Sequence, residues 1–300
     1  MKLRKALDKA RDEREKQIVL EEPFESQSES GHLYNDHAVD HTTTNESQLR
    51  DFHIKNENPA GDVKQPVEKQ EVLWKKPVYS NSHIYKINPS IVAANRGVCI
   101  NPNAQEIQRY RILKTRIYQH LEADKLNTIM VTSPHKREGK TVNAINMAFT
   151  FAQSMNQTVL LVDCDFTGQD IHKYLGIESS ASLIDYFIEG TPINELIIWP
   201  GVDKLTIISG NRTIADGSEI LSSKQMEELV QEMKYRYDDR YVIFDAPPVL
   251  EHAEAISMAP MVDGIIMVVE AGVTPKKDVQ KALSMLPKEK IIGLLLNKRV

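Results

Sequence analysis

The sequence has few cysteines and no long hydrophobic run. Its two cysteines, Cys99 and Cys164, lack the paired spacing of a zinc site or a disulfide framework, so both are expected to be reduced and structural. No run of about 18 apolar residues occurs, and the charged N-terminus lacks the apolar segment of a signal peptide. We therefore expect a cytoplasmic protein, which a partner could bring to the inner face of the plasma membrane.

A surplus of basic residues is also missing. The 37 Lys and Arg residues stand against 42 Asp and Glu residues, which gives a formal net charge of -5. Nucleic-acid-binding domains usually show a basic surplus that is clustered on one face. Nucleic acid is therefore not an expected partner.

Three regions of the chain differ in composition. Residues 1–20 are highly charged with apolar residues at helical spacing, which predicts a charged helix, either solvated or docked on a partner or an anionic membrane surface. Residues 21–82 are rich in polar residues and cannot bury enough surface to offset the entropy of ordering, so a disordered linker is expected. Residues 83–300 carry the regular pattern of a folded domain.

Short apolar runs alternate with amphipathic segments of helix length in the folded region. The runs lie at 128–133, 158–163, 205–209, 241–245, 264–270 and 291–296. They are apolar on consecutive residues, as in TVLLVD and GIIMVVE, which is typical of strands that are covered on both faces. This alternation predicts an α/β fold with a mainly parallel central sheet flanked by helices.

Residues 128–152 have the pattern of a strand, a tight loop and a helix, with Gly139, Lys140 and Thr141 at the start of the helix. Backbone N–H groups at such a helix start can cradle phosphate, the lysine can reach the terminal phosphates, and the threonine hydroxyl can ligate magnesium. The strict phosphate-loop pattern is not met, because Pro134 stands at the position of its first glycine. An isolated Gly-Lys-Thr could be an exposed loop; the flanking strand and helix favour phosphate binding.

Carboxylates end two further predicted strands. Asp163 and Asp165 follow one of them and Asp245 ends another, at the edge where parallel sheets bind ligands. Asp245 suits a Walker B carboxylate that holds magnesium through a water, and Asp163 could orient the metal shell or accept a proton. Each aspartate could instead cap the helix that follows it.

The ordered segments SPHKREGKT, VLLVDCDF, VIFDAPPVL, DGIIMVV and GLLLN resemble the cytoplasmic domain of bacterial tyrosine kinases from exopolysaccharide and capsule loci. These kinases are relatives of the MinD and ParA partitioning ATPases. The likeness spans residues 84–300 and includes IQRYRILKTRI, ASLIDYFIEG and SEILSS. It implies the fold of a P-loop NTPase.

The resemblance also implies a site for ATP and Mg²⁺. The residues implied to bind the nucleotide are Glu138, Gly139, Lys140, Thr141, Val142 and Asn297, the last near the adenine unless it is an ordinary polar residue at a strand end. Those implied to be catalytic are Lys140, Asp163 and Asp165, where the two aspartates form the Walker A' motif. Those implied to hold the metal are Thr141, Asp163 and Asp245.

The sequence departs from the family pattern at several positions. Arg137 replaces a glycine of the loop, and Thr167 replaces the arginine that ends the Walker A' motif. The self-association motif E-x-x-R-x-x-R reads Gln108, Arg111 and Lys114, which puts ring assembly in doubt. The family's C-terminal tyrosine cluster is not found before the final NKRV. The remaining acceptor candidates in the N-terminal part are Tyr34, Tyr79 and Tyr85.

Three functions follow from these patterns. The first is a tyrosine autokinase that regulates exopolysaccharide or capsule synthesis and chain length, docks on the cytosolic segment of a membrane polysaccharide co-polymerase, and forms a homo-oligomer. The second is a partitioning-type ATPase switch, which the missing tail tyrosines favour. His135 disfavours it, since it stands where those ATPases carry a signature lysine. The third is a nucleotide-binding scaffold without activity.

Overall fold

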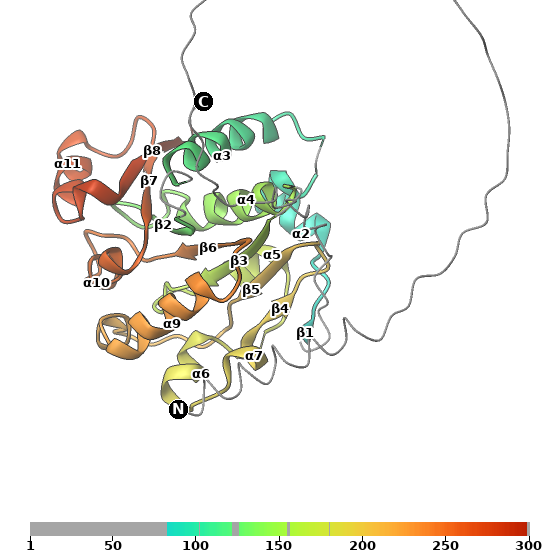
Figure 1. Ribbon diagram of the computed structural model, residues 1–300. Coiled ribbons are helices and arrows are strands. Elements are labelled where there is room, and N and C mark those ends of the chain that lie inside the picture. The colour runs from blue at the N-terminus through green and yellow to red at the C-terminus, as the bar shows by residue number, and fades with distance from the viewer. Residues whose placement is uncertain (1–82, 102, 122–125, 155–156, 180, 299–300) are drawn as a thin grey trace, which may run out of the picture. The chain divides into compact units, whose positions relative to one another are not determined.

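An eight-stranded sheet lies at the centre of the domain (Figure 1). The computed structural model describes residues 83–101, 103–121, 126–154, 157–179 and 181–298. The helix expected over 1–20 and the linker expected over 21–82 lie outside these residues. The strands are β1 (His83–Ile84), β2 (Thr128–Thr132), β3 (Thr158–Asp163), β4 (Ile198–Trp199), β5 (Leu205–Ile208), β6 (Arg240–Asp245), β7 (Gly264–Glu270) and β8 (Ile291–Asn297).

The strands are ordered β1-β4-β5-β3-β6-β2-β7-β8, and all neighbours are parallel except β4 and β5. Six of them coincide with the apolar runs of the sequence. The central strands β2 and β3 are buried along their whole length, which explains why their residues are apolar on consecutive positions. The mainly parallel α/β fold is confirmed.

Helices cover both faces of the sheet. Figure 1 shows α3 (Ile107–Leu121) and α4 (Lys140–Ala152) on one side and α9 (Lys224–Tyr235) on the other. The remaining helical segments are α2 (Pro89–Ala94), η1 (Val98–Ile100), α5 (Ile171–Leu175), α6 (Leu183–Ile188), α7 (Ile193–Leu196), α8 (Ser218–Leu221), α10 (Glu254–Met258), η3 (Ala259–Met261), α11 (Lys276–Ser284) and η4 (Lys288–Lys290). None of the helices in the described ranges is long and apolar enough to cross a membrane.

Helix α4 is buried on nearly all sides. It packs against α3 and against strands β2, β3 and β6, so it lies between the sheet and the outer helix. Val142 is the one α4 residue that is not buried, because it borders a cleft. The first turn of the most enclosed helix therefore opens directly into this cleft.

Candidate functional site

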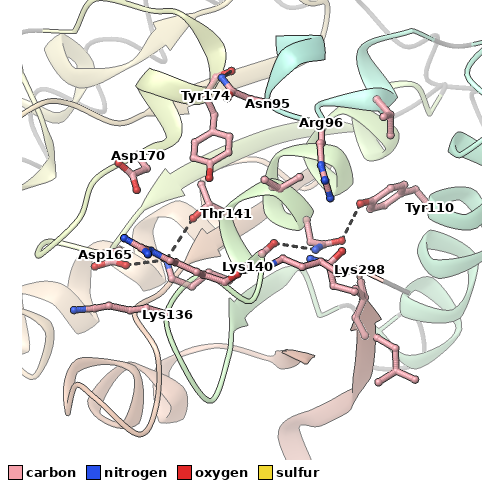
Figure 2. Close-up of a pocket in the computed structure, with 18 of the residues that line it drawn as sticks. Asn95, Arg96, Tyr110, Lys136, Lys140, Thr141, Asp165, Asp170, Tyr174 and Lys298 are labelled. Carbon is pink, nitrogen blue, oxygen red and sulfur yellow. Dashed lines mark hydrogen bonds and ion pairs between the residues drawn. The ribbon is translucent and has the colours of Figure 1, made fainter. Parts of the chain in front are cut away.

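The loop between β2 and α4 borders a cleft of about 1300 Å³. Figure 2 shows Lys140, Thr141 and Asp165 among its lining side chains. The cleft extends from this loop to residues of α2, α3 and β8. Ligand pockets usually measure roughly 300–1,000 Å³, so this one has room for a nucleotide and part of a second reactant.

The ammonium group of Lys140 lies between two carboxylates. Its Nζ is 2.8 Å from Asp165 Oδ2 and 3.4 Å from Asp245 Oδ1, and all three side chains are almost fully buried. Burial alone would lower the pKa of Lys140, but Asp245 and Asp165 outweigh it and raise that pKa. Burial likewise opposes ionisation of Asp165, yet Lys140 lowers the pKa of that carboxyl. Thr167, which replaces the motif arginine, donates a hydrogen bond of 2.8 Å to Asp165 Oδ1.

Thr141 and Asp245 meet beside this ion pair. The Thr141 hydroxyl donates a hydrogen bond of 2.6 Å to Asp245 Oδ2, and both groups are buried. Hydroxyl and carboxylate oxygens are ligands that small divalent cations prefer. The two residues therefore fit a divalent metal bound next to a phosphate group.

Asp163 makes a different set of contacts. Its Oδ2 accepts hydrogen bonds from the N–H groups of Asp170 and Ile171, both at 3.2 Å, and from the Ser209 hydroxyl at 3.0 Å. Burial, together with the neighbouring carboxylate of Asp245, raises the pKa of Asp163 well above its usual range. Asp163 thus holds the start of α5 against the end of β3, one layer behind the residues that line the cleft.

Hydrogen bonds of Glu138 and Asn297 hold the phosphate loop in its conformation. The Glu138 carboxylate accepts a hydrogen bond of 3.0 Å from the His135 N–H and another from the Thr274 hydroxyl. The Asn297 side chain donates a hydrogen bond of 2.7 Å to the Glu138 carbonyl. Gly139 has a φ of 99°, and a Cβ there would lie 2.0 Å from Asn297 Nδ2. Asn297 therefore contacts the backbone of the phosphate loop. Its role in binding the adenine of ATP stays a prediction.

Arg137 occupies the loop position where the family pattern has glycine, and its φ is 66°. This left-handed conformation suits glycine and costs other residues roughly 1–2 kcal/mol. Lys298 Nζ donates a hydrogen bond of 2.7 Å to the Arg137 carbonyl and is 2.9 Å from Glu270 Oε2. The loop thus keeps the backbone shape expected of glycine, with Lys298 holding the turned carbonyl.

The His135 ring points away from the phosphate loop toward carboxylates of the same chain. Its Nε2 lies 3.2 Å from Asp278 Oδ2 on α11, and its Nδ1 lies 3.7 Å from Glu251 Oε1. Glu251 also accepts a hydrogen bond of 2.8 Å from the Lys136 N–H. His135 therefore anchors the loop internally, which differs from the role of the signature lysine of partitioning ATPases, which acts across a dimer.

The far wall of the cleft is joined to α4 by side-chain amides. Asn143 accepts a hydrogen bond of 2.8 Å from the Tyr110 hydroxyl. Asn146 accepts one of 3.0 Å from the Cys99 N–H and donates one of 3.0 Å to the Arg96 carbonyl. The sequence pattern pointed to none of these side chains, because their partners lie on other segments of the chain. The one sequence signal was the position of Asn143 and Asn146 on the predicted helix shortly after Lys140.

The similarity of this chain to known proteins lies in the same region, which contains the cleft. A family model described as an AAA domain matches residues 127–288. Tyrosine-protein kinase YwqD of Bacillus subtilis is 30% identical over 198 residues, which are 65% of this chain and 82% of YwqD. The chain belongs to the bacterial tyrosine-kinase family. Tyrosine-protein kinase CpsD of Streptococcus pneumoniae is 27% identical to this chain over 213 residues, which are 70% of the chain and 91% of CpsD.

A solved structure shows the same fold. The kinase domain of Escherichia coli tyrosine kinase ETK superposes with a TM-score of 0.63 at 23% identity, covering 75% of this chain and 92% of that domain. This match confirms the predicted P-loop NTPase fold, and the relatives YwqD and CpsD confirm the predicted tyrosine-kinase family and its enzyme class, an ATP-dependent phosphotransferase. The family implies that ATP binds together with a divalent metal, for which Thr141 and Asp245 are suited.

Proposed function

We propose that this chain transfers the γ-phosphoryl group of ATP to tyrosine, in the regulation of exopolysaccharide or capsule synthesis and chain length. The observation that carries the proposal is the buried contact of Lys140 with Asp165 and Asp245 at the floor of a nucleotide-sized cleft. A lysine in that position neutralises charge on the transferred phosphoryl group, and this electrostatic stabilisation is the main task of a phosphotransferase.

Mg²⁺ is the divalent metal that we propose for the site. Thr141 and Asp245 would hold it, and when bound it neutralises charge on the β- and γ-phosphates. Asp163, which contacts the backbone of α5, would support the metal shell from behind. Backbone N–H groups of the loop from Glu138 onward would cradle the phosphates.

Of the two expected catalytic aspartates, Asp165 is the better placed. Asp165 lines the cleft and pairs with Lys140, so it fixes the direction in which the ammonium points. Asp163 lies behind it and its Oδ2 accepts three hydrogen bonds. We infer that Asp165 acts on the reactants through Lys140 and that Asp163 keeps the frame of the site in place.

The proposed partner is the cytosolic segment of a membrane polysaccharide co-polymerase, also called a chain-length determinant protein, which would bring this protein to the inner face of the membrane. In support, tyrosine-protein kinase etk of Escherichia coli matches this chain over only 31% of its own length, so it carries further segments in the same polypeptide. Homo-oligomerisation through the α3 motif has less support, because Lys114 binds the Ser154 hydroxyl at 2.9 Å inside the chain.

The test is the fate of γ-labelled phosphate from magnesium-ATP. We expect label on tyrosine, and we expect Lys140→Met to remove it, because the charge that stabilises the transferred group is lost. Since Lys140 compensates buried carboxylates, circular dichroism must show that the variant is folded, and Asp165→Asn provides a second, isosteric variant with reduced transfer. Label found only as inorganic phosphate would refute the kinase proposal in favour of an ATPase.

A further inference from the structure

The cleft contains a tyrosine that lies within the proposed catalytic site. Tyr174 is on α5, packs partly against the core, and lines the same cleft as Lys140 and Thr141. In Figure 2 its ring extends into the cleft with the hydroxyl directed toward Thr141. Its position places a phenol oxygen on the side of the cleft where the terminal phosphates of a nucleotide held by Lys140 would lie.

The Tyr174 hydroxyl has no hydrogen-bond partner among the described residues, unlike the other tyrosines near α4. The Tyr110 hydroxyl donates to Asn143, and the Tyr118 hydroxyl is 3.2 Å from Ser154 Oγ. Buried polar groups are normally paired, so a partly buried hydroxyl that is free and faces a ligand cleft is available to a ligand.

The backbone that carries Tyr174 is held on two sides. The Asp163 carboxylate accepts hydrogen bonds from the N–H groups at the start of α5. The Asn95 side chain donates a hydrogen bond of 3.3 Å to the Tyr174 carbonyl. The ring therefore enters the cleft from a fixed helix and not from a loop. Fixing both reactants in one geometry converts a two-body reaction into a one-body reaction and lowers its entropic cost.

We propose that Tyr174 is an internal phosphoacceptor, phosphorylated by the active site of its own chain. This inference rests on the proposed kinase function and deepens it by naming the acceptor. It also accounts for an acceptor within residues 83–298, independently of any tyrosine cluster at the C-terminus.

The chemical step is balanced by groups already in the cleft. A bond forms between the Tyr174 phenol oxygen and the γ-phosphorus of ATP, while the bond from that phosphorus to the β,γ-bridging oxygen breaks and ADP leaves. The phenol proton passes to the carboxylate of Asp170, which lines the cleft one helical turn before Tyr174. Asp170 Oδ1 pairs with Lys173 Nζ at 2.8 Å, and the partly exposed carboxylate borders the cleft.

Positively charged side chains around the cleft would stabilise phosphotyrosine at position 174. Arg96 and Lys136 line it, and Figure 2 shows both side chains on the walls around Lys140. Phosphotyrosine carries about two negative charges near pH 7, which such groups stabilise. The phosphorylated side chain would occupy part of the space that the substrate nucleotide needs, so the modification is expected to slow further turnover.

The experiment is phosphosite mapping by mass spectrometry after incubation of the full chain with magnesium-ATP. We expect phosphate on Tyr174 and its loss in Tyr174→Phe. The matched control is Tyr235→Phe, because Tyr235 is 71% exposed on α9 and does not line the cleft. Binding of a fluorescent ATP analogue should be unchanged in Tyr174→Phe, which separates loss of the acceptor from loss of the nucleotide site.

Two further measurements decide the outcome. The initial rate per chain should not change on dilution, and active protein should not label Tyr174 of the Lys140→Met variant, since transfer occurs within one chain. Phosphate on other tyrosines with Tyr174 unmodified would overturn this inference and leave the kinase proposal standing. Phosphate on no tyrosine at all would overturn both.

Discussion

Asn297, the last residue of β8, donates a hydrogen bond of 2.7 Å to the carbonyl of Glu138 in the phosphate loop. The contact joins residues that are 159 positions apart. It ties the shape of the loop to the edge strand of the sheet, and its Nδ2 fills the space beside Gly139 where a larger residue would have its Cβ. Two predictions follow from this contact.

Asn297→Ala should weaken ATP binding by roughly fivefold, because one hydrogen bond that holds the loop is worth about 1 kcal/mol. Isothermal titration calorimetry with magnesium-ATP measures the effect. Ile188→Ala is the control, since Ile188 on α6 is 53% exposed and does not line the cleft. Equal affinities of Asn297→Ala and the wild type would show that the loop keeps its shape without this contact.

Gly139→Ala should destabilise the loop more than Gly272→Ala. Both glycines have positive φ, so both variants incur backbone strain of roughly 1–2 kcal/mol. Only at Gly139 does the new Cβ also meet a neighbouring atom, whereas nothing lies within 4 Å of a Cβ at Gly272. Thermal unfolding and ATP titration of the two variants make the comparison, and identical behaviour would contradict the steric argument.

Arg137→Gly should stabilise the protein by about 0.5–1 kcal/mol, because glycine adopts the left-handed conformation without strain. The Arg137 carbonyl remains available to Lys298, so the loop keeps that hydrogen bond. Arg137→Ala is the control, since it removes the same side chain but retains the strain. Chemical denaturation should rank the glycine variant as the most stable; a gain in the alanine variant of equal size would assign the effect to charge.

Asp263 should make the domain sensitive to acid. Burial alone would raise the pKa of Asp263, but Lys234 and the N–H groups of Asn127 and Thr128 lower it. A lowered pKa means that the stabilisation is complete above the unfolded-state value of about 3.9 and is lost as the pH falls through the folded-state value.

Asp263→Asn should therefore cost roughly 1–3 kcal/mol near pH 7, because it leaves the partly buried Lys234 unpaired, and should flatten the loss of stability below about pH 4. Denaturant unfolding between neutral and acid pH tests both parts. Glu228→Gln is the control, because its exposed pair with Lys224 contributes little. An unchanged acid slope in Asp263→Asn would place the sensitivity at other carboxylates.

The sequence predicted the long strands well because their burial imposes a visible pattern. TVLLVD and GIIMVVE are apolar on consecutive positions, and these residues lie in buried strands β3 and β7. Strands β1 and β4 have two residues each, too few for any periodicity, so they could not be recognised. β1 pairs with β4, and β4 pairs with β5, and no local pattern encodes these contacts between distant segments.

The prediction of the site was limited because several of its contacts join residues that are far apart in the sequence. Gly139, Lys140 and Thr141 were found because three adjacent residue types define their chemistry. Glu138 stays a predicted nucleotide-binding residue, but the sequence did not reveal that its carboxylate accepts a hydrogen bond from Thr274, a partner 136 positions away. The direction of Tyr174 into the cleft is likewise set by the packing of α5, which a sequence pattern does not reveal.

The contacts of Asn146 have a consequence for mutational studies of this protein. One amide on α4 bonds the backbone of Arg96 and Cys99 and lies 3.3 Å from the Tyr110 hydroxyl. Free-energy effects of substitutions that share a partner do not add. Positions 96, 99, 110 and 146 are therefore expected to be epistatic, so the tolerance of any one of them depends on which residue stands at the other three.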